Sequence, residues 1–122
     1  MHVDLLACAV CHCLAARKQA RALTRHYESR LRRHGLKATQ FSVLASLALA
    51  GPTPMGELAE LLGLERTTLT RGAALLEEKG WISAEKADDR RARPLRLTAA
   101  GRRKLDSAYP AWKAAQDSAA TI

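Results

Sequence analysis

The chain has 122 residues, which is the length of one domain of ordinary size. Its 20 Lys and Arg residues exceed its 12 Asp and Glu residues, and the formal net charge of +8 favours a polyanionic partner such as nucleic acid. Hydrophobic residues make up 48% of the chain and aromatic residues only 4%, which predicts a mainly helical fold. The sequence has no run of about 18 apolar residues, which argues against a membrane span.

The first predicted element is an amphipathic helix over residues 14–33 that ends at Gly35. Apolar residues recur through it at helical spacing, among them Leu14, while the arginines fall largely on other positions. A second helix follows, with Thr39 as its expected N-cap and Gly51 at its end. Its leucines, including Leu49, are too apolar for a surface, so we expect this helix to be well buried.

Two further helices form the next predicted unit. The stretch "PTPMGELAELLG" begins with prolines suited to a helix entry, stops at Gly63, and should point Met55, Leu58, Leu61 and Leu62 inward. The stretch "LERTTLTRGAALLEEKG" predicts a longer helix with an inner stripe of Leu64, Leu69, Ala73 and Leu76 and a stop at Gly80. Such a pair is typical of a helix-turn-helix, whose second helix fits a DNA major groove.

A hairpin and a last helix complete the chain. "WISAEK" and "PLRLT" alternate as short strands on either side of the charged "ADDRRAR", which predicts a two-stranded β-wing with a basic tip. Thr98 then caps a helix that Pro110 kinks or interrupts. Tyr109 and Trp112 are large side chains near the end of a small domain, so we expect a partner chain to cover them.

The segment "LGLERTTLTRGAALLEEKGWISAEKADDRRARPLRLTAAGRRKL" resembles the MarR-type transcriptional regulators, most specifically in "DDRR" followed by "LRLTAAGRRKL". The resemblance implies a single domain over residues 1–122, with helical dimerisation arms at 1–35 and 98–122 around a winged helix-turn-helix core at 36–97. It also implies a homodimer on a palindromic operator, with a small-molecule effector pocket between the subunit interface and the winged helix. The expected interface residues are Leu23, Tyr27, Leu31, Tyr109 and Trp112.

The residues at the start of the second helix of the pair have side chains suited to DNA contact. Threonine hydroxyls can meet phosphates or base edges, and arginines can reach guanine edges or the backbone. Capping and plain solvent exposure are the alternative roles for these residues. The expected contact residues here are Arg66, Thr67, Thr68, Thr70 and Arg71.

The wing supplies a second group of expected DNA contacts. The spacing of Asp89 and Arg91 lets a carboxylate hold a guanidinium in one direction for insertion into the minor groove. Arg90 and Arg93 would add phosphate contacts. The alternative is a solvated hairpin tip.

Catalysis is disfavoured by what the sequence lacks. There is no Gly-rich phosphate loop, no HExxH and no GxSxG, and the glutamate pairs suit helix surfaces better than acid/base chemistry. The prediction is therefore a transcriptional regulator, most often a repressor in this class, and not an enzyme. The alternative is a winged-helix module for protein contacts without sequence-specific DNA binding.

The stretch "CAVCHC" puts Cys8, Cys11, His12 and Cys13 into six residues and contains every cysteine of the chain. The preceding "MHVD" lacks the basic region of a secretory signal, so we expect a cytoplasmic, nucleoid-associated protein with reduced thiols. If the segment is extended, the four side chains can converge on zinc, the thiolates alone on arsenite or a trigonal soft metal, and a thiol pair can close as a disulfide. No cofactor is required, and the alternative is that the cysteines pack as small hydrophobes beside Leu5, Leu6 and Val10.

Overall fold

The computed structural model describes residues 2–85 and 93–122, so Asp89, Arg90 and Arg91 lie outside the described residues. Five α-helices form most of this part of the chain, and short 3₁₀ helices at Leu5–Val10, Arg32–His34 and Ala119–Thr121 extend the first and last of them. The α-helices are α1 (His12–Leu31), α2 (Ala38–Ala50), α3 (Met55–Leu62), α4 (Arg66–Glu78) and α5 (Ala99–Ser118). No helix in the described ranges has the length and apolar character to cross a membrane.

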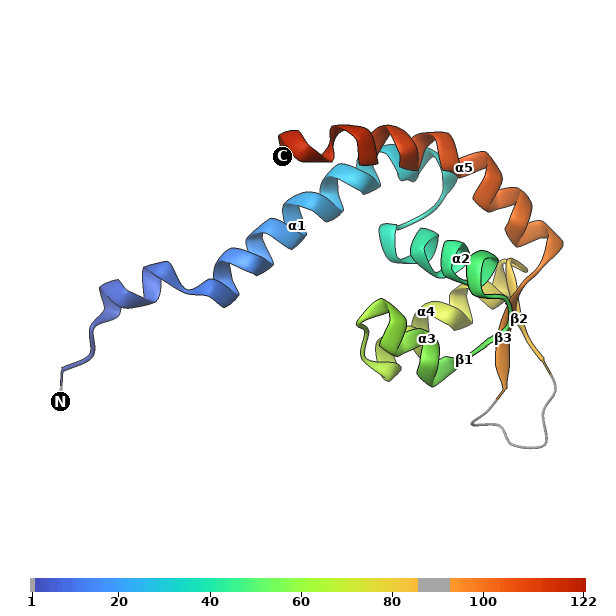
Figure 1. Cartoon of the computed structure of the whole chain (residues 1–122), viewed down its shortest axis with the longest axis horizontal. Coiled ribbons are helices and arrows are strands. Elements are labelled where there is room, and N and C mark those ends of the chain that lie inside the picture. Colours follow the sequence, from blue (N-terminus) through green and yellow to red (C-terminus); the bar gives the residue numbers. More distant parts are fainter. Residues whose placement is uncertain (1, 86–92) are drawn as a thin grey trace.

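Two long helices define the outline of the molecule (Figure 1). The C-terminal half of α1 packs beside α5, whereas its N-terminal half projects away from the body toward the chain's N-terminus. Every described residue from His2 to Arg21 is exposed. The body of the protomer is thus built from α2 to α5 and the end of α1.

A small antiparallel sheet lies beside the helices. Strand β2 (Ile82–Ala84) pairs with β3 (Pro94–Leu97), and β3 also pairs with the two-residue strand β1 (Thr53–Pro54), giving the order β1-β3-β2. The β2–β3 hairpin is the predicted two-stranded wing, and the winged-helix fold predicted from the sequence is confirmed. Strand β1 was not predicted, because two residues before a helix show no period-2 alternation.

One hydrophobic core joins all of these elements. Leu31 of α1, Leu44 of α2, Leu58 of α3, Leu76 of α4 and Leu95 of β3 are each 2% exposed or less. The burial of side chains of this size contributes about 1.5–3 kcal/mol each relative to exposure. The core therefore fixes α4 against the rest of the protomer through its apolar stripe.

The inner and outer faces of three helices differ from the sequence prediction. Leu49 is 90% exposed and Leu61 is 64% exposed, although both were expected to point inward, and Leu14 is also largely exposed. Leu49 comes two residues after the buried Leu47, which places it about 200° further around α2, on the side away from the buried residues. Helix α2 begins at Ala38 with Lys37 as its N-cap, not Thr39, since the Gln40 side chain accepts a hydrogen bond from the Lys37 N–H at 2.9 Å.

Helix α5 runs without a break through Pro110. Proline removes one backbone donor, so the carbonyl four residues earlier, at Asp106, loses its helical partner. Both Asp106 and Pro110 are exposed, which lets water satisfy that carbonyl. The expected interruption at Pro110 is therefore absent from this helix.

The N-terminus of α5 is fixed to the backbone that follows α4. Thr98 Oγ1 donates to the Gly80 carbonyl at 2.6 Å and accepts from the Gly101 N–H at 3.0 Å, and the Thr98 N–H donates to the Trp81 carbonyl at 3.1 Å. A Cβ at Gly101 would lie 1.9 Å from the Trp81 carbonyl oxygen. Only glycine permits the helix to approach this closely.

We expect Gly101→Ala to lower the free energy of unfolding by about 1–3 kcal/mol or more, because the methyl group overlaps backbone atoms that cannot rotate away. Gly72→Ala is the matched control, since nothing lies within 4 Å of its Cβ position in α4. This control should gain about 0.5–1 kcal/mol from helix propensity. Urea unfolding at one protein concentration measures both, and equal effects in the two variants would contradict the close approach.

Candidate nucleic-acid interface

A tight turn sets the angle between α3 and α4. Gly63 ends α3 with a φ of 66°, its N–H donates to the Glu60 carbonyl at 3.1 Å, and the Leu64 N–H donates to the Ala59 carbonyl at 2.9 Å. This pair of bonds satisfies the last carbonyls of α3, and the positive φ explains the glycine. Leu64 packs on the core, so α4 leaves the turn in a fixed direction.

Helix α4 presents a polar face at its N-terminal end. Leu69, Ala73 and Leu76 are buried against the body, and all five predicted contact residues on this helix are exposed. The structure therefore brings Arg66, Thr67, Thr68, Thr70 and Arg71 together on the exposed surface of the first two turns of one helix.

Two of these side chains also have contacts within the protomer. The Thr70 hydroxyl donates to the Arg66 carbonyl at 2.8 Å, which leaves its oxygen lone pairs available as acceptors. The guanidinium of Arg66 reaches toward α3, where a Cβ at Gly56 would lie 4.0 Å from its Nη1 atom. The helix surface thus offers donors and acceptors held on a rigid element, as base and phosphate contacts require.

The wing is closed at its base by two hydrogen bonds. The Glu85 N–H donates to the Pro94 carbonyl at 2.8 Å, and Arg93 Nε donates to the Glu85 carbonyl at 3.2 Å. Arg93 is half-buried, so its side chain braces the hairpin in addition to the phosphate contact predicted for it. The predicted tip contacts Asp89, Arg90 and Arg91 lie outside the described residues.

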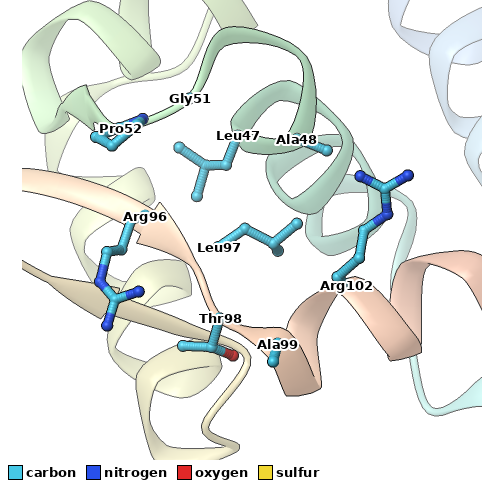
Figure 2. Close-up of a pocket in the computed structure, with 9 residues that line it drawn as sticks. All are labelled: Leu47, Ala48, Gly51, Pro52, Arg96, Leu97, Thr98, Ala99 and Arg102. Carbon is cyan, nitrogen blue, oxygen red and sulfur yellow. The ribbon is translucent and has the colours of Figure 1, made fainter.

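Two cavities lie beside α2 and α5, and strand β3 also lines the first of them. The first, of about 400 Å³, is flanked by Arg96 and Arg102, with Leu47 and Leu97 between them (Figure 2). The second, of about 570 Å³, has a mostly apolar lining that includes Phe41, Leu49, Leu105, Tyr109 and Trp112. The sequence assigns no residue to this cavity: Tyr109 and Trp112 are expected at the subunit interface and Leu49 in the core. The apolar Leu49 near the end of α2 was the available signal.

The predicted interface residues occupy three different environments. Leu31 is fully buried within the single chain, so its assignment to the subunit interface is corrected: it belongs to the protomer's own core. Trp112 is partly covered by its own chain, where it stacks on Phe41 with ring centroids 5.6 Å apart. Leu23 and Tyr27 are half-buried and Tyr109 is 49% exposed, which leaves these three with surface that a partner could cover.

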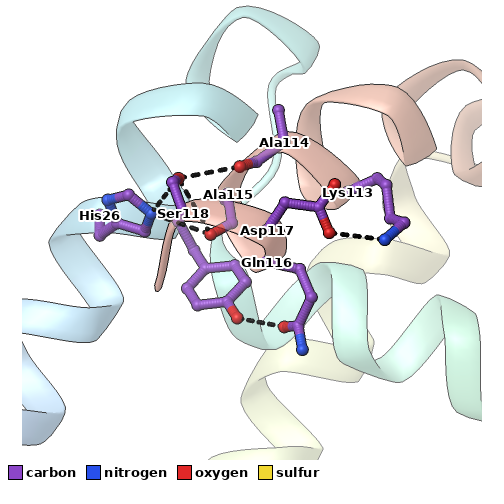
Figure 3. A network of polar contacts seen from close by, with 8 residues as sticks. His26, Lys113, Ala114, Ala115, Gln116, Asp117 and Ser118 are labelled. Carbon is purple, nitrogen blue, oxygen red and sulfur yellow. Dashed lines mark hydrogen bonds and ion pairs between the residues drawn. The ribbon is translucent and has the colours of Figure 1, made fainter. Parts of the chain in front are cut away.

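Polar contacts hold α1 to the end of α5 (Figure 3). His26 Nε2 lies 2.9 Å from the Ala115 carbonyl and 3.0 Å from Ser118 Oγ, so this nitrogen carries the proton that the carbonyl accepts. The Tyr27 hydroxyl donates to the Gln116 side chain. Nearby, the Asp117 carboxylate raises the pKa of Lys113 above its usual value through a 2.5 Å contact.

The cysteine segment lies on the projecting arm. Cys8 is in the 3₁₀ helix, Cys11 is the N-cap of α1, where its Sγ accepts from the Leu14 N–H at 3.5 Å, and Cys13 is in the first turn. All three thiols and His12 are exposed. Within residues 2–85 and 93–122, no three His, Cys, Asp or Glu side chains are grouped to hold a metal ion, so the four do not converge here.

The architecture is that of a winged helix-turn-helix protein with long helices at both ends. A sequence model of the MarR family matches residues 34–92, which span the end of the first arm, the helix-turn-helix and most of the wing. The chain belongs to the MarR family.

Solved and curated relatives agree with this assignment. The M. tuberculosis transcriptional regulator MosR, crystallised with DNA, is 39% identical over 92% of this chain and 83% of its own, with a TM-score of 0.82. Overoxidised AbfR bound to DNA is 27% identical over 84% of this chain and 76% of its own, with a TM-score of 0.75. YwoH of Bacillus subtilis, a helix-turn-helix-type transcriptional regulator, is 32% identical over 73% of this chain, and the match spans 65% of its length.

Proposed function

We propose that this chain is a homodimeric, sequence-specific DNA-binding transcriptional regulator, acting as a repressor. The observation that carries the proposal is the polar N-terminal face of α4, exposed above a fully buried apolar stripe. A helix held this way can enter a major groove, where arginines and hydroxyls meet base edges. The DNA complex of the 39% identical relative supports the same partner.

The subunit interface is proposed from surface that one protomer leaves uncovered. The arm exposes Leu5, Leu6 and Val10, which are each more than 70% exposed. Apolar side chains gathered on one segment favour contact with another protein surface. A second copy of the chain, with its two-fold axis matched to a palindromic operator, accounts for both the arm and the half-covered Leu23, Tyr27, Tyr109 and Trp112.

An effector site is proposed in the cavity lined by Phe41, Leu49 and Trp112. Its volume of about 570 Å³ falls in the range of small-molecule pockets, and its lining is mostly apolar with Arg102 and Asp106 at one side. A ligand there would touch α2 and α5 together, so it could change how the winged helix sits on the long helix. A regulator on chromosomal DNA would be cytoplasmic and nucleoid-associated.

The main test is DNA binding by the purified full chain. We expect it to prefer duplex from upstream of its own coding region over random duplex at moderate salt by on the order of 10³-fold or more, as specific regulators do. Equal affinity for the two duplexes would instead support the alternative, a winged-helix module for protein contacts. Selection from a genomic DNA pool identifies the preferred site.

Arg71→Ala tests the recognition surface. We expect it to weaken operator binding by about 1–3 kcal/mol and to relax sequence preference, because Arg71 is exposed on the polar face of α4. Arg103→Ala removes one exposed charge from α5 as the control. A titration showing the same affinity loss in both variants would contradict a specific contact at Arg71.

A second proposal is that the cysteines sense oxidants or soft metals. The three thiols are exposed and lie within six residues at the start of the arm, and Cys11 also caps α1. Oxidation of two thiols to a disulfide transfers two electrons to the oxidant and changes the local backbone where α1 begins. The DNA complex of an overoxidised relative shows that the oxidised form of such a regulator has been examined on DNA.

We expect peroxide, zinc or arsenite to change operator affinity of the wild type and to leave a Cys8→Ser, Cys11→Ser, Cys13→Ser variant unaffected. Reduced protein of both kinds should bind equally, since the thiols are exposed and none is part of the core. Fluorescence anisotropy titrations measure all conditions. Equal operator affinities across every treatment of the wild type would show that the thiols have no sensing role.

A further inference from the structure

The positive charge of the chain is concentrated on its first helix, not on the helix-turn-helix. Residues 12–34 hold seven of the 20 basic residues and one acidic residue, so they carry a formal charge of +6 of the chain's +8. Residues 55–79, which contain α3 and α4, hold three basic and five acidic residues, a formal charge of −2. The module that faces the bases is therefore not the main source of electrostatic attraction to DNA.

The basic residues of α1 form a continuous row. Because an α-helix turns by about 100° per residue, Arg17, Arg21 and Arg25 follow one another along one face about 6 Å apart. Lys18 lies within the same sector, and so does Arg32, which is in the 3₁₀ helix that extends α1. We call these five residues the α1 stripe: Arg17, Lys18, Arg21, Arg25 and Arg32.

Along the C-terminal half of α1, the opposite face of the helix is occupied by the protomer itself. Leu31 is buried in the core, and His26 and Tyr27 bond to the last turns of α5. These contacts turn Arg25 and Arg32 away from the body, while Arg17, Lys18 and Arg21 lie on the projecting half of the same helix. All five of its residues are exposed.

No ion pair to the α1 stripe is present among the described residues, and Glu28 is the one acidic residue of this helix near it. The two ion pairs among the described residues both lie inside α5, and the sequence has no acidic residue between Asp4 and Glu28. Glu28, half-buried, is the single acidic residue of the helix and sits one turn from Arg25. A row of like charges held at this density is complementary to a regularly spaced polyanion.

We infer that the α1 stripe contacts the phosphate backbone of the same duplex that α4 recognises, and supplies affinity that is independent of sequence. This inference rests on the proposed function. Duplex DNA presents one phosphate per about 3.4 Å of axis on each strand, so guanidinium groups about 6 Å apart can each find one. Specificity then resides in α4, and the salt-dependent part of the affinity resides largely in α1 and the wing.

The test compares two triple variants of the full chain that remove equal charge. The stripe variant is Arg17→Gln, Arg21→Gln, Arg25→Gln. The control variant is Arg30→Gln, Arg33→Gln, Arg103→Gln, which takes three exposed arginines from outside the stripe. Operator and random duplex are titrated at several salt concentrations, and sedimentation velocity gives the oligomeric state of each protein.

We expect the stripe variant to flatten the plot of log affinity against log salt by about 2.7 per protomer, since each lost phosphate contact removes about 0.9 from the slope. Affinity near 0.15 M salt should fall by on the order of tenfold or more for both duplexes, with their ratio unchanged. The control variant should keep the slope within about 1 of the wild type.

Three outcomes would overturn the inference while leaving the proposed function intact. The first two are equal changes of the salt slope in the two variants and an unchanged salt slope in the stripe variant. The third is a stripe variant that sediments as a monomer when the wild type does not, because this result would place the stripe in the subunit interface. Stripe-dependent binding to vesicles containing phosphatidylserine, with an unchanged DNA slope, would assign a lipid surface instead. A wild type that binds no duplex would remove the proposed function as well.

Discussion

The contact on which the arrangement depends is the approach of the α5 backbone to the carbonyl of Trp81. Gly101 has no side chain to separate them, and Thr98 bonds both to Gly80 and to its own helix. The end of α4, the start of β2 and the start of α5 are therefore joined within a few residues. Because α5 is fixed to the end of α4 at this point, a displacement of α5 would also displace α4. The packing of the rest of α5 is therefore mechanically connected to α4.

Different parts of this small chain have different roles in DNA binding. The helix-turn-helix is locally acidic overall and holds its polar residues on a rigid frame, which suits discrimination between bases. Residues 12–34, which contain α1 and lie outside that frame, carry a formal charge of +6 of the chain's +8. Attraction and discrimination thus depend on separate surfaces, and substitutions can change one without the other.

Much of the fold follows from local sequence signals, and the differences have physical causes. The glycines at 35, 51, 63 and 80 mark the ends of helices because each takes a positive φ, and Leu69, Ala73 and Leu76 mark the inner face of α4. Leu49 and Leu61 were placed inside wrongly, because hydrophobicity alone does not say which side of a helix packs on the core. Strand β1 depends on pairing with β3, more than 40 residues away in the chain, and no local pattern encodes it.

For the candidate site, the sequence identified the polar residues of α4 correctly as a surface group, while the cavity between α2 and α5 required the tertiary structure. Leu31 shows the limit of periodicity, which identifies an apolar stripe but does not distinguish a stripe buried in its own protomer from one buried in a partner.

The projecting half of α1 has a consequence for how the molecule matures. Helical segments of this length without tertiary support are marginal in water, and residues 12–21 are all exposed in the single protomer. In the proposed dimer a second copy of the chain would supply this support, so the ordering of the arm would be bimolecular and its rate would rise with concentration. At low concentration the arm would then be more accessible to proteases than in the dimer.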